Sequence, residues 1–395
     1  MTVRSTLFKT SLLVAGMATL VGCSSFKNLF GSSSARADKK AAKPAELVKF
    51  TATANFSKVW SVSAGKGDDS AGLVQSPAVA DGHVYAAAVS GGVRAYDLAT
   101  GKQLWAYDSK ARISGGPGAG QGLVVVGGLD GEVIALDAAT GAEKWTAKVI
   151  NEVITAPAIG NGVVVVRSND GRLTAFDMNT GEKHWTWSAE PVALSVRGNS
   201  APLMGPGAVF TGTDSGKLVA IGAADGGQGW EATVADPDGR NELQRMVDVD
   251  GQPVLEGSVL YATSYKGRTV AVDGPSGQIM WAQEHGGAGG VGLGATALVV
   301  SDANDVVWAL DKATGAPMWS YPELTRRSVS APAVLGDYAV VGDYDGYLHW
   351  FRMSDGHLVN RIRFGSGPIR SQPVVADGMV IVQNSGGEIA AFRAN

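Results

Sequence analysis

The chain has 395 residues, a formal net charge of −4 and 45% hydrophobic residues. A composition this apolar excludes intrinsic disorder for most of the chain. The slightly acidic balance argues against nucleic acid as a main partner, because phosphate binding needs a basic surface. One cysteine and five histidines exclude a disulfide scaffold, an iron–sulfur protein and a c-type haem protein. The 54 glycines and 10 tryptophans indicate many tight turns between short strands.

Residues 1–22 have the features of an export signal. Two basic residues precede an apolar run from Thr10 to Leu20, which is too short to span a bilayer. The run ends in Leu-Val-Gly-Cys23, which resembles the lipobox of bacterial lipoproteins. The resemblance implies cleavage before Cys23, acylation of this cysteine and, because no Asp follows it, the outer membrane. The alternative is an ordinary secretory signal with an incidental cysteine.

The next segment, residues 23–50, is rich in Ser, Ala and Lys and has almost no apolar periodicity. Such a composition cannot bury a core, so we expect an acylated flexible tether here. The folded domain is then expected to cover residues 51–395.

From Phe56 onward the sequence repeats itself. A cassette of the form Ala-x-Asp-x-x-Thr-Gly-x-x-x-Trp is clearest where it ends in Trp105, Trp145 and Trp185. The aligned Trp column has eight positions, the last occupied by Asn: 60, 105, 145, 185, 230, 281, 319 and 360. This spacing is typical of propeller blades. Strand-start prolines, β-branched runs and Asp-Gly or Asn-Gly turns predict four short antiparallel strands in each repeat.

The two ends of the repeat array complement each other. The last repeat stops at its third strand, Ala390 to Arg393, and the first tryptophan strand, Asn55 to Val62, precedes any Ala-x-Asp element. We therefore predict an all-β fold, an eight-bladed β-propeller of four-stranded antiparallel blades. The N-terminal strand is predicted to complete the C-terminal blade, which leaves no open edge.

The recurring Asp and Trp of the cassette are interpreted as structural. A short carboxylate at this place accepts N–H bonds from the following turn. A tryptophan that recurs in every blade fills the space between neighbouring sheets. A catalytic interpretation would require many copies of one residue to be catalytic.

Two consecutive connections between repeats are longer than the regular ones. From the Trp position to the next strand-start Pro there are 17 residues after Trp185 and 23 after Trp230, against 12 or 13 in regular repeats. We expect these insertions to lie side by side on one rim, where sites on repeat scaffolds usually form. The candidate partner-binding residues within them are Leu194, Val196, Arg197, Asp248 and Asp250.

Apolar anchors beside an arginine favour a protein interface at these insertions. The alternative is that Leu194 and Val196 pack under their own loop while Arg197 pairs with one of the two carboxylates. We expect no metal and no cofactor. The pair Asp248 and Asp250 lacks the further ligands of a calcium loop, and the histidines lack metal-ligand spacing. No nucleophile elbow predicts catalytic residues either.

The lipobox and the repeated cassettes resemble the quinoprotein-dehydrogenase-like propellers. Over the signal, the tether and all eight repeats, the chain more closely resembles the BamB family of the outer-membrane β-barrel assembly machinery. The stretches 194–198 and 247–250 resemble the two partner-contact segments of that family, with Val196 where the family has Leu.

This resemblance implies a non-catalytic scaffold, anchored by lipid to the outer membrane and facing the periplasm. It implies binding to the POTRA domains of BamA, help in the folding and insertion of outer-membrane proteins, and nascent outer-membrane proteins as a further partner.

Two other functions are alternatives to the scaffold: an enzyme that uses pyrroloquinoline quinone and a carrier of a small ligand. Enzymes of this fold that use pyrroloquinoline quinone are longer, and they carry a vicinal cysteine pair over the cofactor and acidic residues that hold Ca²⁺. This chain has only Cys23, so we do not expect an enzyme. A lipoprotein that holds a small ligand in the propeller channel stays open on sequence alone.

Overall fold

The computed structural model describes residues 43–67, 72–195, 198 and 200–395. Residues 44–395 form one compact unit. The predicted signal, Cys23 and most of the predicted tether lie outside the described residues, as do Val196 and Arg197. Residues 44–50, which we expected in the tether, belong to the same compact unit as the propeller. Within the described part of the chain, no helix has the length and apolar character needed to cross a membrane.

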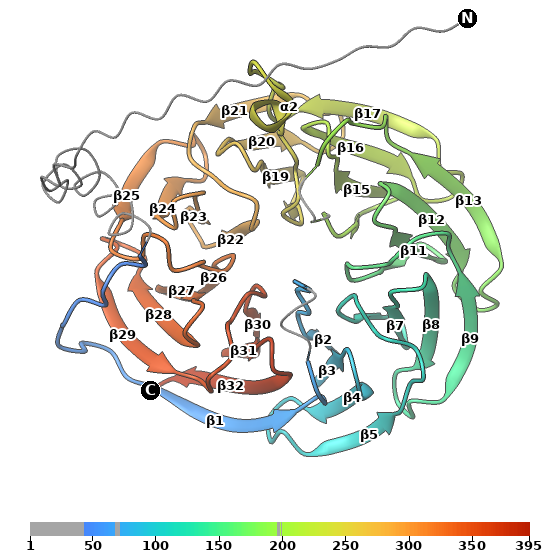
Figure 1. The fold of residues 1–395 in the computed structure, drawn as a ribbon, viewed down its shortest axis with the longest axis horizontal. Helices are drawn as coiled ribbons and strands as arrows, with labels where there is room; N and C mark the ends of the chain where they lie inside the picture. The colour runs from blue at the N-terminus through green and yellow to red at the C-terminus, as the bar shows by residue number, and fades with distance from the viewer. Residues whose placement is uncertain (1–42, 68–71, 196–197, 199) are drawn as a thin grey trace, which may run out of the picture. The chain divides into compact units, whose positions relative to one another are not determined.

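Eight four-stranded sheets are arranged in a ring around a common axis, so the predicted eight-bladed propeller is confirmed (Figure 1). Blades are numbered here in chain order, and within blades 1 to 7 the strands run from the innermost to the outermost. The first four blades have the following strands. Blade 1 has β2 (Ala78–Ala80), β3 (His83–Ala88), β4 (Gly92–Asp97) and β5 (Gln103–Tyr107). Blade 2 has β6 (Gly118–Gly120), β7 (Leu123–Gly127), β8 (Glu132–Asp137) and β9 (Glu143–Lys148). Blade 3 has β10 (Ala158–Gly160), β11 (Val163–Arg167), β12 (Arg172–Asp177) and β13 (Lys183–Ser188). Blade 4 has β14 (Leu203–Met204), β15 (Ala208–Gly212), β16 (Lys217–Gly222) and β17 (Gln228–Thr233).

The remaining blades follow the same order except the last. Blade 5 has β18 (Val254–Glu256), β19 (Val259–Thr263), β20 (Thr269–Asp273) and β21 (Ile279–Gln283). Blade 6 has β22 (Val291–Leu293), β23 (Ala297–Ser301), β24 (Val307–Asp311) and β25 (Pro317–Tyr321). Blade 7 has β26 (Ala333–Leu335), β27 (Tyr338–Gly342), β28 (Tyr347–Arg352) and β29 (Leu358–Arg363). Blade 8 has β30 (Val374–Ala376), β31 (Met379–Gln383), β32 (Glu388–Ala394) and, as its outermost strand, β1 (Phe56–Ser63).

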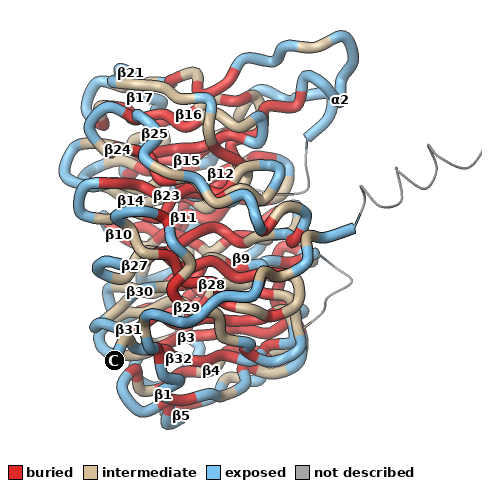
Figure 2. The backbone as a smooth tube through the Cα atoms, turned by 90° about the vertical axis from the view of Figure 1, so that its left-hand side faces the viewer, coloured by how far each residue is buried: buried red, intermediate tan, exposed pale blue. Residues whose placement is uncertain are grey.

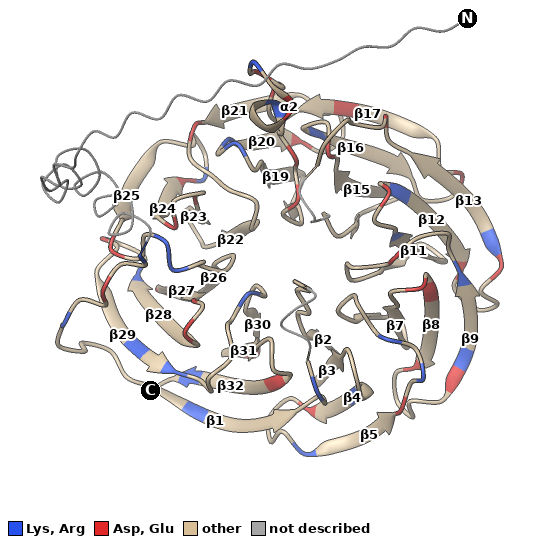
Figure 3. Cartoon of the chain, viewed as in Figure 1, with Lys and Arg blue, Asp and Glu red and all other residues tan. Residues whose placement is uncertain are grey.

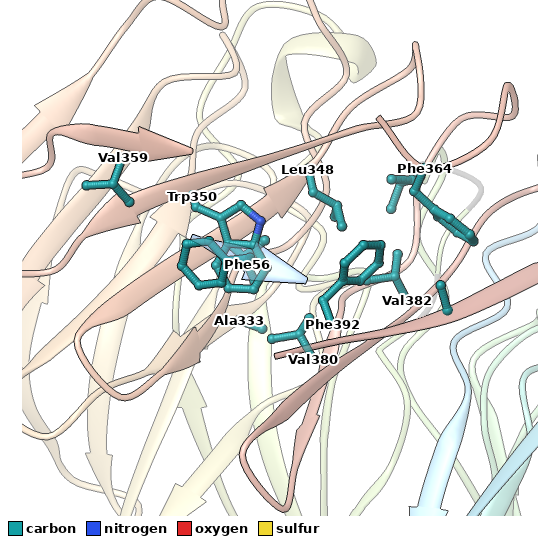
Figure 4. Packing of buried hydrophobic residues seen from close by; sticks show 12 residues of the cluster. Phe56, Ala333, Leu348, Trp350, Val359, Phe364, Val380, Val382 and Phe392 are labelled. Atoms are coloured by element: carbon teal, nitrogen blue, oxygen red, sulfur yellow. The ribbon is translucent and has the colours of Figure 1, made fainter. Parts of the chain in front are cut away.

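The ring is closed by the pairing of the two ends of the propeller. Phe56 of β1 lies opposite Ala394 of β32 in an antiparallel ladder, as the sequence predicts. The Phe56 ring stacks on Trp350 of blade 7 with 3.8 Å between ring centroids. The same apolar cluster includes Phe392 from β32 (Figure 4). β1 therefore joins blades 7 and 8 by packing as well as by hydrogen bonds.

Each cassette tryptophan packs against a glycine of the next blade. A Cβ atom on Gly141 of blade 2 would lie 2.6 Å from the ring of Trp105 of blade 1, so only glycine fits there. The Trp105 Nε1 donates to the carbonyl of Ala138 in the same turn of blade 2 at 2.9 Å. All seven column tryptophans donate to the next blade in this way: Trp60, Trp105, Trp145, Trp185, Trp230, Trp281 and Trp319.

The eighth position of the column, Asn360, has a structural explanation. The turn that would receive a tryptophan from blade 7 does not exist, because blade 8 is interrupted there by the two ends of the propeller. The Asn360 Nδ2 instead donates to the carbonyl of Ala54, just before β1, at 2.6 Å. A polar residue thus replaces the tryptophan where the ring is sealed by the N-terminal segment.

The cassette aspartates have the predicted structural role. In blade 3, the Asp177 Oδ1 accepts the backbone N–H groups of Asn179 and Thr180 at 2.9 and 2.8 Å. These bonds, chiefly the one from Thr180, lower the pKa of Asp177.

The strand order gives the propeller two different faces. The connections between blades and the turns between second and third strands lie on one side, which we call the loop face; its described residues include 189–195, 198, 200–202 and 234–253. The turns between first and second strands and between third and fourth strands lie on the opposite side, the turn face; it includes residues 161–162 and 178–182.

Candidate functional site

The two insertions lie side by side on the loop face, as the sequence predicts. The Ser200 Oγ at the end of the first insertion donates to the carbonyl of Gly251 at the end of the second, at 3.1 Å. The two segments also touch at Gly198, where a Cβ atom would lie 2.9 Å from the Asp250 carboxylate. The connections between blades 3, 4 and 5 therefore form one continuous rim.

The second insertion carries a short helix, α2 (Glu242–Arg245), which projects beyond the sheets (Figure 2). Asn241 begins it by accepting the backbone N–H of Gln244 at 2.9 Å. This cap holds Leu243 with 66% of its side chain exposed. Leu194 on the first insertion is 46% exposed. The rim thus presents two leucines to solvent from adjacent loops.

Exposed apolar side chains are unevenly distributed between the two faces. Among the described residues, six large exposed hydrophobic residues lie on the loop face: Val74, Ile150, Val192, Leu194, Leu243 and Tyr265. None of the described ones lies in a turn of the turn face; the others are in strands or in the N-terminal segment. Neighbouring exposed apolar side chains mark interaction surfaces, whereas single ones are ordinary, so the two leucines on adjacent insertions carry the most weight. The loop face is therefore the candidate binding face.

The two predicted carboxylates lie beneath this rim. Asp248 is fully buried and Asp250 is partly buried. The reason is that residues 246–249 run between blades 4 and 5, where the N–H of Val249 donates to Thr213 and the carbonyl of Asp248 accepts from Tyr265. A partner on the rim would therefore contact the loops that cover the Asp248 carboxylate. Direct contact of a partner with Asp248 and Asp250 stays a prediction.

The carboxylates form a cluster with two residues from neighbouring blades. Oxygens of Asp214, Asp248 and Asp250 lie within 4.8 Å of one another. Arg167, at the end of β11 in blade 3, donates to Asp214 at 2.7 Å, and its side chain is only 2% exposed. Arg167 also donates to the carbonyl of Gly212 at 2.7 Å. The cluster therefore ties blade 3 to blade 4 directly under the two insertions.

Burial destabilises the charged forms of the residues in this cluster. Burial, and next the charge of Asp248, raise the pKa of Asp250 to about 7. Neither oxygen of Asp250 has a hydrogen-bond partner among the described residues. Burial also lowers the pKa of Arg167, an effect opposed first by the charge of Asp214. Three carboxylates could offer oxygen ligands to a cation, but the guanidinium already occupies their neighbourhood, so they are explained as a structural ion-pair cluster.

Arg167, Asp214 and Leu243 were missed by the sequence reasoning. A signal for Arg167 was present, because the equivalent positions at the ends of second strands are mostly small. They are Ala87, Gly127, Gly212, Thr263, Ser301, Gly342 and Gln383. An arginine at a position that is mostly small in the other blades indicates a role specific to blade 3. No comparable signal distinguished Asp214 or Leu243.

The pocket between blades 1 and 8 has little room for a quinone or another organic ligand. It is lined by Leu73, Gln75, Arg370, Ser371 and Gln383, among others. Its interior has space for about one water molecule, against several hundred Å³ for a typical ligand site. These residues do not fit a tricyclic quinone. Positive and negative side chains are interspersed around the ring, so charge marks no single sector (Figure 3).

Comparison with known proteins decides the family. The family model described as outer membrane protein assembly factor BamB matches residues 44–108, 89–321 and 323–395. The BamB of Xanthomonas campestris is 53% identical over 98% of both chains. The chain belongs to the BamB family. The BamB of Pseudomonas aeruginosa is 45% identical, again over 98% of both chains.

Solved structures agree with this assignment. The crystal structure of BamB from Moraxella catarrhalis superposes with a TM-score of 0.77 at 25% identity, covering 86% of this chain and 100% of that one. The quinohemoprotein alcohol dehydrogenase of Comamonas testosteroni has a TM-score of 0.67 at 15% identity, covering 85% of this chain and 76% of that one. That likeness concerns the fold alone.

Proposed function

We propose that the protein is an outer-membrane protein assembly factor that works as a scaffold and not as an enzyme. In this proposal it is acylated at Cys23, sits on the periplasmic face of the outer membrane and binds the POTRA domains of BamA. The binding site is the rim formed by the two insertions on the loop face. Membership of the BamB family supports the general role, and the geometry of the rim supports the site.

The observation that carries the proposed site is the pair of exposed leucines on adjacent insertions. Leu194 is 46% exposed and Leu243 is 66% exposed, and both loops rest on the buried cluster around Arg167. Apolar anchors on a rigid base favour binding, because little conformational freedom is lost when the partner arrives. Val196 and Arg197 adjoin Leu194 in the chain, and we assign them to the same contact.

Asp248 and Asp250 are assigned a positioning role in this site. The fully buried Asp248 acts from below the rim, and the Asp250 carboxylate lies where a Cβ atom on Gly198 of the first insertion would meet it at 2.9 Å. Removing either carboxylate should change the shape of the first insertion, so binding of BamA would weaken without loss of a direct contact.

The test is a pull-down of BamA from detergent-solubilised outer membranes with the tagged, acylated protein. Leu194→Asp places a charge on the rim and should reduce recovered BamA by about tenfold or more, the usual effect of losing an interface anchor. The double variant Leu194→Ala/Arg197→Ala should act in the same direction. The matched control is Leu104→Asp on β5, because Leu104 is 45% exposed on the outer edge of blade 1.

Recovery of BamA by the wild type and by Leu104→Asp, with loss in Leu194→Asp, would support the site. Equal recovery by all three proteins would remove the rim from the proposal. Failure of the wild type to recover BamA would contradict the scaffold function itself. Circular dichroism spectra of each variant check that the propeller is intact.

A further inference from the structure

Residues 44–55, which we call the strap, lie along the outer edge of blade 7. The Ala45 N–H donates to the carbonyl of Thr325 in the connection between blades 6 and 7, at 2.9 Å. The Thr53 N–H donates to the carbonyl of Val359 in β29, at 3.0 Å. Between them, Leu47 packs against the buried cluster shared by blades 6 and 7. The strap is therefore bound to the propeller before β1 begins.

Two arginines hold the carbonyl groups of the strap. The Arg327 Nη1 donates to the Ala45 carbonyl and the Arg361 Nη1 donates to the Val48 carbonyl, both at 3.0 Å. The Arg361 guanidinium also lies 5.1 Å from the centre of the Phe50 ring. A cation over an aromatic face adds a further attraction at this exposed position.

A buried network fixes both arginines. The Asp343 Oδ2 accepts from Arg327 Nε at 2.8 Å and contacts His349 Nε2 at 2.9 Å. Arg361 Nε in turn donates to His349 Nδ1 at 3.2 Å. The side chains of Asp343 and His349 are fully buried. A continuous chain of hydrogen bonds thus runs from one strap carbonyl, through blade 7, to the other.

The direction of the strap decides where the preceding chain leaves the disc. Ala45 bonds to a connection between blades, which belongs to the loop face. Thr53 bonds near the start of β29 (Leu358–Arg363), which begins at the turn face. The strap therefore runs from the loop face to the turn face, and residue 44 lies on the loop face. This point is two blades away from the connection between blades 4 and 5 that carries α2.

We propose that the strap orients the disc on the membrane, so that the loop face is turned toward the lipid bilayer and the turn face away from it. The inference rests on the proposed acylation of Cys23 and concerns this anchor and its bilayer alone. The anchor would then pull on one edge of the loop face, and the candidate rim would lie on the membrane side of the disc.

Chain length makes this orientation the less restricted one. Residues 24–43 separate the acylated cysteine from the strap, and 20 residues span at most about 70 Å. A strand of six residues is about 20 Å long. To present the turn face to the bilayer, the anchor segment must first run back along that height past the blade edge. Every such arrangement uses part of the length of residues 24–43 before they reach the bilayer. No part of this length is used in that way when the loop face is turned toward the lipid.

The test uses energy transfer from a labelled site to a rhodamine headgroup acceptor in phosphatidylethanolamine and phosphatidylglycerol vesicles. Because Cys23 is the only cysteine and is acylated, a second cysteine can be labelled alone. Ser366→Cys places the label on the loop face beside blade 7, and Ala313→Cys places it on the turn face of blade 6; both positions are exposed. We expect about twofold more transfer from Ser366→Cys, because about 20 Å separates the faces.

The strap is released by Leu47→Ser together with Phe50→Ser, which alters no propeller residue. The matched control is Glu46→Ser with Lys49→Ser, because both of these side chains are exposed strap residues. The difference between the two label positions should vanish in the release variant and persist in the control. Amide hydrogen exchange at Thr53 should rise in the release variant alone, which shows that the strap has left blade 7.

Equal transfer from the two labels in the wild type would overturn the proposal, as would a difference that survives strap release. Vesicle flotation separates these results from failure of the proposed function. Protein that does not float with vesicles contradicts the lipid anchor and the orientation together. Protein that floats but shows equal transfer contradicts the orientation alone, and BamA recovery is unaffected by that outcome.

Discussion

The contact between a cassette tryptophan and the glycine of the next blade predicts a large effect from a single added methyl group. In blade 3, Gly181 has a φ of +74°, and a Cβ atom there would lie 2.7 Å from the Trp145 ring. Gly162 in the same blade has a φ of +79° with nothing within 4 Å of such an atom. Gly162→Ala should therefore cost about 1 kcal/mol of unfolding free energy, from backbone strain alone.

Gly181→Ala carries the same strain and also displaces the Trp145 ring. The ring would lose the bond from its Nε1 to the carbonyl of Met178, now 2.9 Å long, worth about 1 kcal/mol. Forcing a buried side chain from its place costs a further 1–3 kcal/mol or so. The expected total for Gly181→Ala is about 3–5 kcal/mol, the sum of these strain, hydrogen-bond and packing estimates.

The assay is urea unfolding followed by far-ultraviolet circular dichroism. Trp145→Ala is the third variant, and combining it with Gly181→Ala measures the energetic coupling between the two positions. Once the ring is absent, adding Gly181→Ala should cost only the strain of about 1 kcal/mol, as at Gly162. Contact with the tryptophan is not the reason that glycine is required if Gly162→Ala lowers the unfolding free energy as much as Gly181→Ala. The same conclusion follows if the loss in Trp145→Ala/Gly181→Ala equals the sum of the losses in the two single variants.

Four further substitutions test other parts of the molecule in unfolding experiments. Phe56→Ala removes the ring stacked on Trp350 at 3.8 Å and should cost about 3–5 kcal/mol; a loss below about 1 kcal/mol would contradict its part in closing the ring. The pKa of Asp250 is raised to about 7, so the folded state keeps a proton that the unfolded state releases, and wild-type stability should fall as pH rises from about 4 to about 7. Asp250→Asn should flatten this dependence in thermal unfolding, and an unchanged slope would count against the shift. Arg167→Met should cost about 3–5 kcal/mol because it leaves buried carboxylates uncompensated. Lys217→Met, at an exposed pair, should cost less than about 1 kcal/mol, and equal losses would refute the difference in burial.

The architecture was predictable because its determinants recur at fixed spacing. Each cassette encodes its own turn through the Asp side chain and its own blade contact through the Trp and Gly, as Asp177 and Gly181 show. The closure of the ring followed from the missing strand at each end, which Phe56 and Ala394 supply. The position of the two insertions followed from their order in the chain, because consecutive connections occupy neighbouring sectors of one face.

Features that depend on contacts across blades were not predictable in this way. Asp248 is buried because its segment bonds to blade 4 on one side and blade 5 on the other, which no local pattern records. Residues 44–50 of the strap are expected in the tether because they have no apolar periodicity. Its bonds to Arg327 and Arg361 use backbone carbonyls, which every residue possesses and which leave no mark on composition.

The pairing of β1 with β32 has a consequence for the order of folding. Phe56 and Ala394 are paired in space but lie near opposite ends of the domain's sequence. The outermost strand of blade 8 therefore has no partner until the whole chain is available. Contacts between such distant residues form slowly. Until they form, the third strand of blade 8 and the outer edge of blade 7 stay exposed, and such edges promote association with other chains. A chain that ends before β32 cannot close the ring, so completion of the whole chain is itself a condition for the native state.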